Sequence, residues 1–503
     1  MPRRSGPGGY RPAHRAGRRK GRYGYKPAPR VATGPQGPKA GMMRALAPAR
    51  TRFIGSVLVE PFAPAMRQEA ERGDDALARE GVAFDAACSS FPVCVPYRFT
   101  LMTGLAAHTR DVPCRGWRLS PAERTLADEF NEAGYDTAWI GKWHLFGTDP
   151  PEPGWVPPEH RGRFGYWEGF EKINGHFETV LYRGPERRPE KYDGYQTDVL
   201  VDRALAWLAA RGTPDRTTGA RKRSGRAAAK PFFLVLSVEP PHPPLEAPAA
   251  YQQRRLAQPP LLPGNFMHAA TDTGPEPKMP AGQRAGAIRN RQLYQAMVDN
   301  LDDNVGRFLD GLASLGHAGD TVIVFTADHG QMDGAHALPN VVKRLPFEES
   351  IGVPLIVRDP RRARTKGKRA DEVVGSEDLY PTLLALAGID VPAGLPGKTL
   401  APLLDKPAAR LDRPGLLLYL THHLTPEHPW YQRAWRGIRT REHLFACWGP
   451  RAAGLRPWLL FDIANDPQQL RNRLKDDRPT AARLADTLRA LMEGGGDHMQ
   501  LRV

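Results

Sequence analysis

The sequence predicts an α/β protein in which a doubly wound, largely parallel sheet carries helices on both faces, with a small C-terminal α+β subdomain. Three continuous apolar runs, at residues 232–238, 321–325 and 354–357, have the length and composition of buried strands. Helical patterns alternate with these runs, and the longest, at residues 293–315, places Leu301 on an apolar face. Such alternation is typical of a doubly wound sheet.

The first half of the chain supplies shorter elements of the same kind. Proline at the start of a helical pattern and glycine after its end mark the limits of the helices. The predicted elements are helices at 66–80, 119–133 and 195–210, a strand at 135–140, and a short strand at 53–59 that is broken by the prolines after it. The segments expected to be irregular are 147–192, 254–288 and the basic insert 211–230.

The pattern changes after Leu404, where short strands at 436–448 and 458–463 precede an amphipathic helix at 480–492. This mixture predicts a separate, smaller subdomain. We therefore expect three parts: a basic, disordered tail at 1–65, the main α/β domain at 66–404 and the C-terminal subdomain at 405–503.

The formal net charge of +16 belongs to the tail. Residues 1–59 hold fourteen Lys or Arg and no Asp or Glu, which leaves 57 basic and 55 acidic residues in the rest of the chain. No nucleic-acid-binding motif follows the tail, so a nucleic-acid partner is not expected. No apolar run reaches membrane-spanning length, and no secretory signal or disulfide framework is visible, so a soluble, cytoplasmic protein is expected.

A reactive anion site is predicted where Cys94-Val95-Pro96-Tyr97-Arg98 runs into an apolar helical pattern. Proline suits the first turn of a helix, so Cys94 would lie at a helix N-terminus, where free amides favour negative charge. Arg98, one turn later, adds a planar cation suited to an oxyanion. The alternative is that Cys94 is a small buried residue and Arg98 faces water.

Three polar residues follow predicted strands directly. His144 comes after the strand at 135–140, His242 after that at 232–238, and Asp328 after that at 321–325. Ligands of doubly wound sheets bind beyond the carboxyl ends of the strands, so these side chains are expected on one rim. A single histidine after a strand is more often a packing residue, but three polar residues in equivalent places favour a functional site.

Five stretches in order resemble the formylglycine-dependent sulfatases of the alkaline phosphatase superfamily. The resemblance covers residues 77–492, and five motifs in order are far more specific than one. The five stretches are Cys94-Val95-Pro96-Tyr97-Arg98, Gly141-Lys142-Trp143-His144, Pro241-His242-Pro243, Thr326-Ala327-Asp328-His329-Gly330, and Lys343 with Phe347-Glu348-Glu349-Ser350.

The resemblance implies hydrolysis of a sulfate ester. Cys94 would be oxidised to formylglycine by a formylglycine-generating or anaerobic sulfatase-maturing enzyme, and its hydrated aldehyde would be the nucleophile. Arg98 and Lys142 would hold that diol, and His144 would take a proton as sulfate leaves. His242 and Lys343 would stabilise the departing alcohol oxygen of a sulfated small molecule or carbohydrate.

The resemblance also implies a divalent cation, Ca²⁺ or alternatively Mg²⁺ or Mn²⁺, that binds the sulfate and the nucleophile. Asp328 would supply a hard oxygen ligand and the converted Cys94 another. His329 would bind either the metal or a sulfate oxygen, because imidazole is a softer ligand than calcium prefers.

Two features depart from the family pattern. Tyr97 stands where serine or alanine is common, and the paired aspartates that end the first strand of family members are missing before Met66. Asp74-Asp75 and Asp302-Asp303 lie in predicted helices and are rejected as that pair. Without these two carboxylates a calcium site would hold its ion weakly, and a central strand would be missing as well. Either a shifted reading frame or a misplaced start, which we favour, or a naturally inactive relative would explain the difference. A phosphonate monoester or phosphodiester hydrolase with the same nucleophile is the alternative enzyme.

Overall fold

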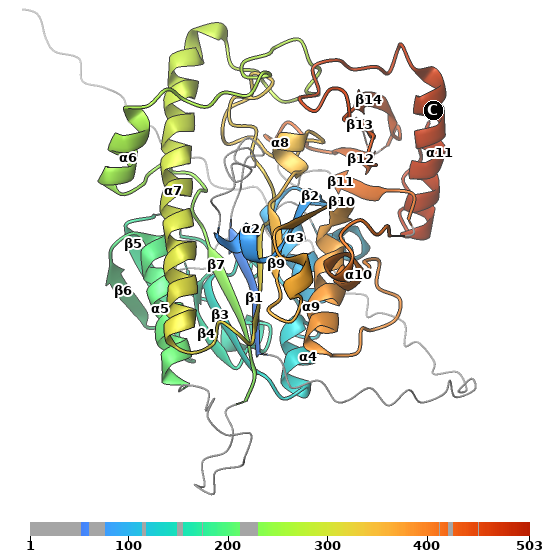
Figure 1. The fold of residues 1–503 in the computed structure, drawn as a ribbon. Coiled ribbons are helices and arrows are strands. Elements are labelled where there is room, and N and C mark those ends of the chain that lie inside the picture. The colour runs from blue at the N-terminus through green and yellow to red at the C-terminus, as the bar shows by residue number, and fades with distance from the viewer. Residues whose placement is uncertain are drawn as a thin grey trace, which may run out of the picture. The chain divides into compact units, whose positions relative to one another are not determined.

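A computed structural model describes residues 52–59, 76–112, 117–147, 154–173, 175–211, 230–411, 413–420, 426–450 and 452–502. Within these ranges the chain forms one ten-stranded mixed sheet and one four-stranded antiparallel sheet (Figure 1). Residues 1–51 and 60–65 of the predicted tail, residues 212–229 of the predicted insert and the first part of the predicted helix at 66–80 lie outside the described residues.

The large sheet is mostly parallel, as predicted. In order across the sheet, its strands are β10 (Lys368–Gly375), β2 (Val82–Cys88), β9 (Leu355–Arg358), β8 (Thr321–Ala327), β1 (Arg52–Val59), β7 (Phe232–Val238), β3 (Asp136–Lys142), β4 (Tyr166–Phe170), β5 (Glu178–Arg183) and β6 (Pro189–Asp193). Strand β9 runs antiparallel to both neighbours, and β4, β5 and β6 form an antiparallel edge. All other pairs are parallel.

Helices cover both faces of this sheet (Figure 1). Helices α5 and α7 pack together on one side of the central strands, while α3, α4 and α9 pack together on the other. The helices are α2 (Ala76–Glu80), α3 (Cys94–Thr103), α4 (Leu126–Glu132), α5 (Gln196–Ala210), α6 (Ala249–Leu256), α7 (Arg284–Ser314), α8 (Glu348–Ile351), α9 (Leu379–Ala387), α10 (Ala401–Asp405) and α11 (Arg478–Gly494). The doubly wound α/β prediction is therefore confirmed.

Strand β1 occupies the centre of the sheet, between β7 and β8. Its last residue, Val59, pairs with Val238 of β7 and with Ala327 of β8, so the three strands end level with one another. The prediction that a central strand would be lost is wrong, because the apolar stretch before Glu60 is long enough to form it. The residues that follow Val59, through 75, lie outside the described ranges.

Three predicted segments differ in the structure. Helix α4 begins at Leu126 rather than at residue 119, since Thr125 and Asp128 form its capping box. The excursion at 147–192 contains β4, β5 and β6, which extend the sheet. The stretch at 254–288 includes the end of α6 and the start of α7.

The C-terminal subdomain is α+β, as predicted. Its sheet consists of β11 (Leu416–Leu420), β12 (Arg433–Arg439), β13 (His443–Pro450) and β14 (Arg456–Asp462). The single strand predicted at 436–448 is instead a hairpin, whose turn is closed by the Thr440 amide donating to the His443 carbonyl. Leu484 and Leu488 of α11 pack on this sheet with Phe445. No helix in the described ranges has the length and hydropathy needed to cross a bilayer.

Candidate active site

Cys94 is the first residue of α3, and its side chain is buried. Val93 before it is extended, with φ −149°, and Pro96 occupies the first turn, so the helix starts where the sequence predicts. The Cys94 Sγ lies 3.3 Å from His329 Nε2 and 3.2 Å from Lys343 Nζ. A helix N-terminus and a lysine both favour negative charge at this position.

His329 has a defined orientation. Its Nδ1 lies 2.8 Å from the Gly330 carbonyl oxygen, so Nδ1 donates there and the lone pair of a neutral ring is on Nε2. Nε2 faces both Cys94 Sγ and Asp328 Oδ1, which is 3.5 Å away. Such a ring is oriented as a metal ligand, because a backbone acceptor fixes its tautomer.

Cys94, Asp328 and His329 form a buried cluster whose ligand atoms all lie within 4.8 Å of one another. This donor set fits a divalent cation, with one carboxylate, one imidazole and, after oxidation of Cys94, an oxygen in place of sulfur. Calcium takes six to eight oxygen ligands, so these three donors supply only part of its shell. Val59 pairs with Ala327, which puts the carboxyl end of β1 beside Asp328.

Arg98 is fully buried and braces the rim of the sheet. Its Nη1 donates to the Lys142 carbonyl oxygen and to Ser237 Oγ, both at 2.9 Å. One guanidinium therefore joins α3 to the ends of β3 and β7. The structure thus places the Arg98 guanidinium against the Lys142 backbone, and the alternative that Arg98 faces water is wrong.

Lys142 forms a buried ion pair with Glu239. Lys142 Nζ lies 2.9 Å from Glu239 Oε1, and the two side chains are 1% and 0% exposed. The Glu239 carbonyl also accepts the His242 amide at 3.0 Å, so Glu239 contacts two predicted site residues. Sequence reasoning missed Glu239; its place directly after β7, on the predicted rim, was the available signal.

His242 and His144 follow the strands predicted for them. His242 Nδ1 donates to the Pro243 carbonyl at 2.7 Å, and the His242 carbonyl accepts from His176 Nε2 at 2.7 Å. His144 follows β3 with φ 57°, in the left-handed region that disfavours side chains. These contacts link Cys94, Asp328, His329 and Lys343 into one group, and Arg98, Lys142, Glu239 and His242 into another.

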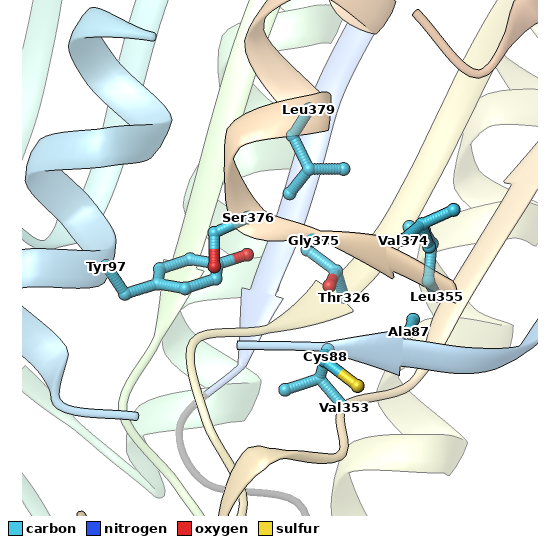
Figure 2. Close-up of a pocket in the computed structure, with 10 residues that line it drawn as sticks. All are labelled: Ala87, Cys88, Tyr97, Thr326, Val353, Leu355, Val374, Gly375, Ser376 and Leu379. Atoms are coloured by element: carbon cyan, nitrogen blue, oxygen red, sulfur yellow. The ribbon is translucent and has the colours of Figure 1, made fainter. Parts of the chain in front are cut away.

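Tyr97, the residue that departs from the signature, lies on the side of α3 that packs against the sheet. Its ring points toward Ser376 and lines a small cavity with Cys88 and Thr326 (Figure 2). The cavity holds about 10 Å³, close to the space of a single water. Burial raises the pKa of the Tyr97 phenol well above its usual value. Tyr97 is therefore a buried residue of the core.

A polar network that sequence reasoning missed holds the loop carrying Lys343. Asn265 Nδ2 donates to Glu349 Oε1 at 2.6 Å and lies 3.1 Å from His336 Nε2. Burial raises the pKa of Glu349 to about 7 and lowers that of His336 to about 3. These side chains tie the residues before and after Lys343 to the stretch around Asn265.

Comparison with known proteins identifies the family. The sulfatase family model matches residues 63–389, and the C-terminal model of N-sulphoglucosamine sulphohydrolase matches residues 336–494. An ulvan-active sulfatase of Formosa agariphila is 29% identical over 80% of this chain and 71% of its own length. An endo-4-O-sulfatase of Bacteroides thetaiotaomicron is 28% identical over 80% of each chain.

Solved structures share the fold. A sulfatase of Bacteroides fragilis superposes with a TM-score of 0.75 at 23% identity, over 91% of this chain and 98% of that one. The phosphonate monoester hydrolase of Agrobacterium radiobacter gives a TM-score of 0.68 at 21% identity, over 89% and 96%. The family model matches well over half of the sequence, and its named relatives are sulfatases; the chain therefore belongs to the sulfatase family of the alkaline phosphatase superfamily and is a sulfuric ester hydrolase.

Proposed function

We propose that this protein hydrolyses a sulfate ester with a formylglycine derived from Cys94 and a bound divalent cation. The observation that carries the proposal is the position of Cys94: it begins α3, it touches Lys343 and His329, and it forms a ligand cluster with Asp328. The proposed nucleophile, the cationic Lys343 and the proposed metal ligands thus lie close together, as covalent catalysis with a metal ion requires.

The roles proposed for the site residues come from the resemblance to the family, and some of their contacts support them. Lys343, 3.2 Å from Cys94 Sγ, stabilises negative charge on the departing ester oxygen. His242 donates from Nδ1 to a carbonyl, which directs Nε2 to protonate that oxygen. From the resemblance to the family, we propose that Arg98 and Lys142 hold the diol and that His144 takes a proton from it as sulfate leaves; Arg98 and Lys142 are hydrogen-bonded to each other.

The cation would be held by Asp328, by the converted Cys94 and by His329, with Ca²⁺ proposed first and Mg²⁺ or Mn²⁺ as alternatives. When bound, it supplies positive charge that neutralises the sulfate and the nucleophile. His329 Nε2 faces Asp328 at 3.5 Å, which supports its assignment as a ligand.

The substrate class we propose is a sulfated carbohydrate or a sulfated small molecule. Two relatives are named an ulvan-active sulfatase and an endo-4-O-sulfatase, and these names support that substrate class. A formylglycine-generating or anaerobic sulfatase-maturing enzyme would be the partner that converts Cys94. We propose that the protein is cytoplasmic; the buried Cys447, which forms no disulfide in the described part of the chain, supports a reducing compartment.

A phosphonate monoester or phosphodiester hydrolase is the second candidate. The structural neighbour with that activity supports it, since the fold alone accommodates either reaction. Sulfate monoesters carry one negative charge at the reacting group and phosphonate monoesters carry one as well, so charge does not separate them. The two reactions are distinguished by the hydrolysis rates of an aryl sulfate and an aryl phosphonate that share the same leaving group.

The test uses the full chain, produced together with a sulfatase-maturing enzyme and supplied with calcium. Sulfate release from para-nitrophenyl sulfate is measured beside hydrolysis of para-nitrophenyl phenylphosphonate, and the peptide that contains Cys94 is analysed by mass spectrometry. We expect an aldehyde at Cys94 and faster release of sulfate. An aldehyde with faster phosphonate hydrolysis would establish the second candidate. The absence of both the aldehyde and hydrolysis would establish that the protein is an inactive relative.

A further inference from the structure

The loop after β3 carries His144 in a conformation that needs support. His144 has φ 57°, and a residue other than glycine in the left-handed region costs about 1–3 kcal/mol. Trp143 before it is anchored by its amide, which donates to the Phe170 carbonyl at 2.7 Å. The side after His144 needs an equivalent anchor if the imidazole is to stay in one place.

Glu171 provides that anchor. It directly follows β4 and is 1% exposed. The Phe146 amide lies 3.1 Å from each of its carboxylate oxygens, and the Gly147 amide lies 3.1 Å from Oε1. Successive amides that converge on one anion form a backbone nest, here filled by a side chain of the protein itself. The Glu171 amide is bonded in turn to the Gly154 carbonyl at 2.8 Å.

The negative charge of Glu171 is stabilised by the loop amides that it binds and by Arg98. Burial raises the pKa of the Glu171 carboxyl to about 7, while the amides of Phe146 and Gly147 and the charge of Arg98 oppose that rise. A neutral amide side chain of the same shape can therefore take part of its place, because one oxygen remains to accept from the nest.

We propose that Glu171 is a positioning residue that fixes His144 for proton transfer by binding the amides of Phe146 and Gly147. The inference rests on the proposed function only in taking His144 as a catalytic residue. The amides of Trp143 and Phe146 are both held at the carboxyl end of β4, by Phe170 and Glu171, so His144 and Leu145 lie between two anchored residues.

The loop has further supports that do not involve Glu171. The Leu119 amide donates to the Leu145 carbonyl at 2.8 Å, and Arg118 Nε donates to the Phe146 carbonyl at 2.8 Å. The Arg118 guanidinium also lies over the Phe146 ring, 4.2 Å from its centre. Loss of the Glu171 carboxylate is therefore expected to shift the backbone around His144 without unfolding the loop.

The test compares Glu171→Ala and Glu171→Gln with the wild type, all produced with the maturing enzyme. Glu129→Gln is the matched control, because Glu129 is also a buried carboxylate but bonds Arg124 and Tyr380 instead. We expect kcat on para-nitrophenyl sulfate to fall about 10- to 100-fold in Glu171→Ala with KM changed less than about threefold, because displacement of a catalytic group acts on the chemical step. Glu171→Gln should recover part of the loss.

A crystal structure of Glu171→Ala separates this proposal from the proposed function. We expect residues 144–147 to be displaced while β3 and β4 keep their places. A wild type without hydrolytic activity would contradict the proposed function, and the position of His144 in the two crystal structures would still decide the positioning role. An unmoved His144, or a kcat equal to that of Glu129→Gln, would overturn the proposal.

Discussion

Replacing Lys142 by methionine should destabilise the fold strongly, because it leaves Glu239 charged in a closed environment. The two side chains are 1% and 0% exposed, and their charged atoms lie 2.9 Å apart. Removing one partner of such a pair costs about 3–5 kcal/mol, whereas replacing both by neutral residues of similar volume is often close to neutral. The double variant Lys142→Met with Glu239→Gln should therefore be more stable than either single variant.

The size of the effect can be measured by heat or by urea. An unfolding entropy of roughly 2.1 cal/mol/K per residue gives about 1 kcal/mol/K for 503 residues, so each single variant should lose about 3–5 °C. Urea unfolding of wild type, both single variants and the double variant completes a thermodynamic cycle. Additive losses, with the double variant as unstable as the sum of the single variants, would refute a coupled buried pair.

Three further predictions concern the nucleophile, the cation and a buried carboxyl. Cys94→Ala should reduce sulfate release to background in a coupled assay, with a melting temperature within about 2 °C of wild type, because only a small buried side chain is truncated. Calcium at about 100 times its dissociation constant should add about 2.7 kcal/mol to the free energy of unfolding, and calorimetry with Asp328→Asn should show that gain reduced. Because burial raises the folded-state pKa of Glu349 to about 7, the stability it contributes at low pH is lost as the pH rises from about 4.5 to 7. Urea unfolding should show wild type losing up to about 3 kcal/mol relative to Glu349→Gln across that window, with no further change above it; a constant difference would contradict the raised pKa.

The position of Cys94 at the start of a helix was predictable because its signals are local. Pro96 and the apolar pattern after Arg98 set the start of α3, and the carboxyl ends of β7 and β8 placed His242 and Asp328 on one rim. These inferences need only the spacing of apolar residues along the sequence and the geometry of parallel sheets. The identity of the family followed from the order of the motifs.

The supporting residues were not predictable in the same way. Glu171 and Glu239 look like ordinary surface carboxylates in the sequence, and only tertiary structure shows that both are buried against loop amides or a lysine. Their partners are more than twenty residues away in the chain. Buried polar pairs of this kind leave no periodic pattern.

The edge of the sheet was misread for a different reason. Strands β4, β5 and β6 are short, and β6 alternates between exposed and half-buried residues, so they lack the apolar runs that marked β7 and β8. The prolines after β1 suggested a broken strand, although a strand needs only the residues before them. Pairing with β7 and β8 on both sides stabilises β1 at the centre.

The most direct test of the account measures sulfate release by the matured, calcium-loaded protein and by its Cys94→Ala variant, with the aldehyde at position 94 quantified in the same samples. The account predicts that wild type carries the aldehyde and releases sulfate from an aryl sulfate faster than it hydrolyses the matching phosphonate, and that the variant does neither. Equal sulfate release by Cys94→Ala would contradict it, because the nucleophile would then lie elsewhere than at the start of α3.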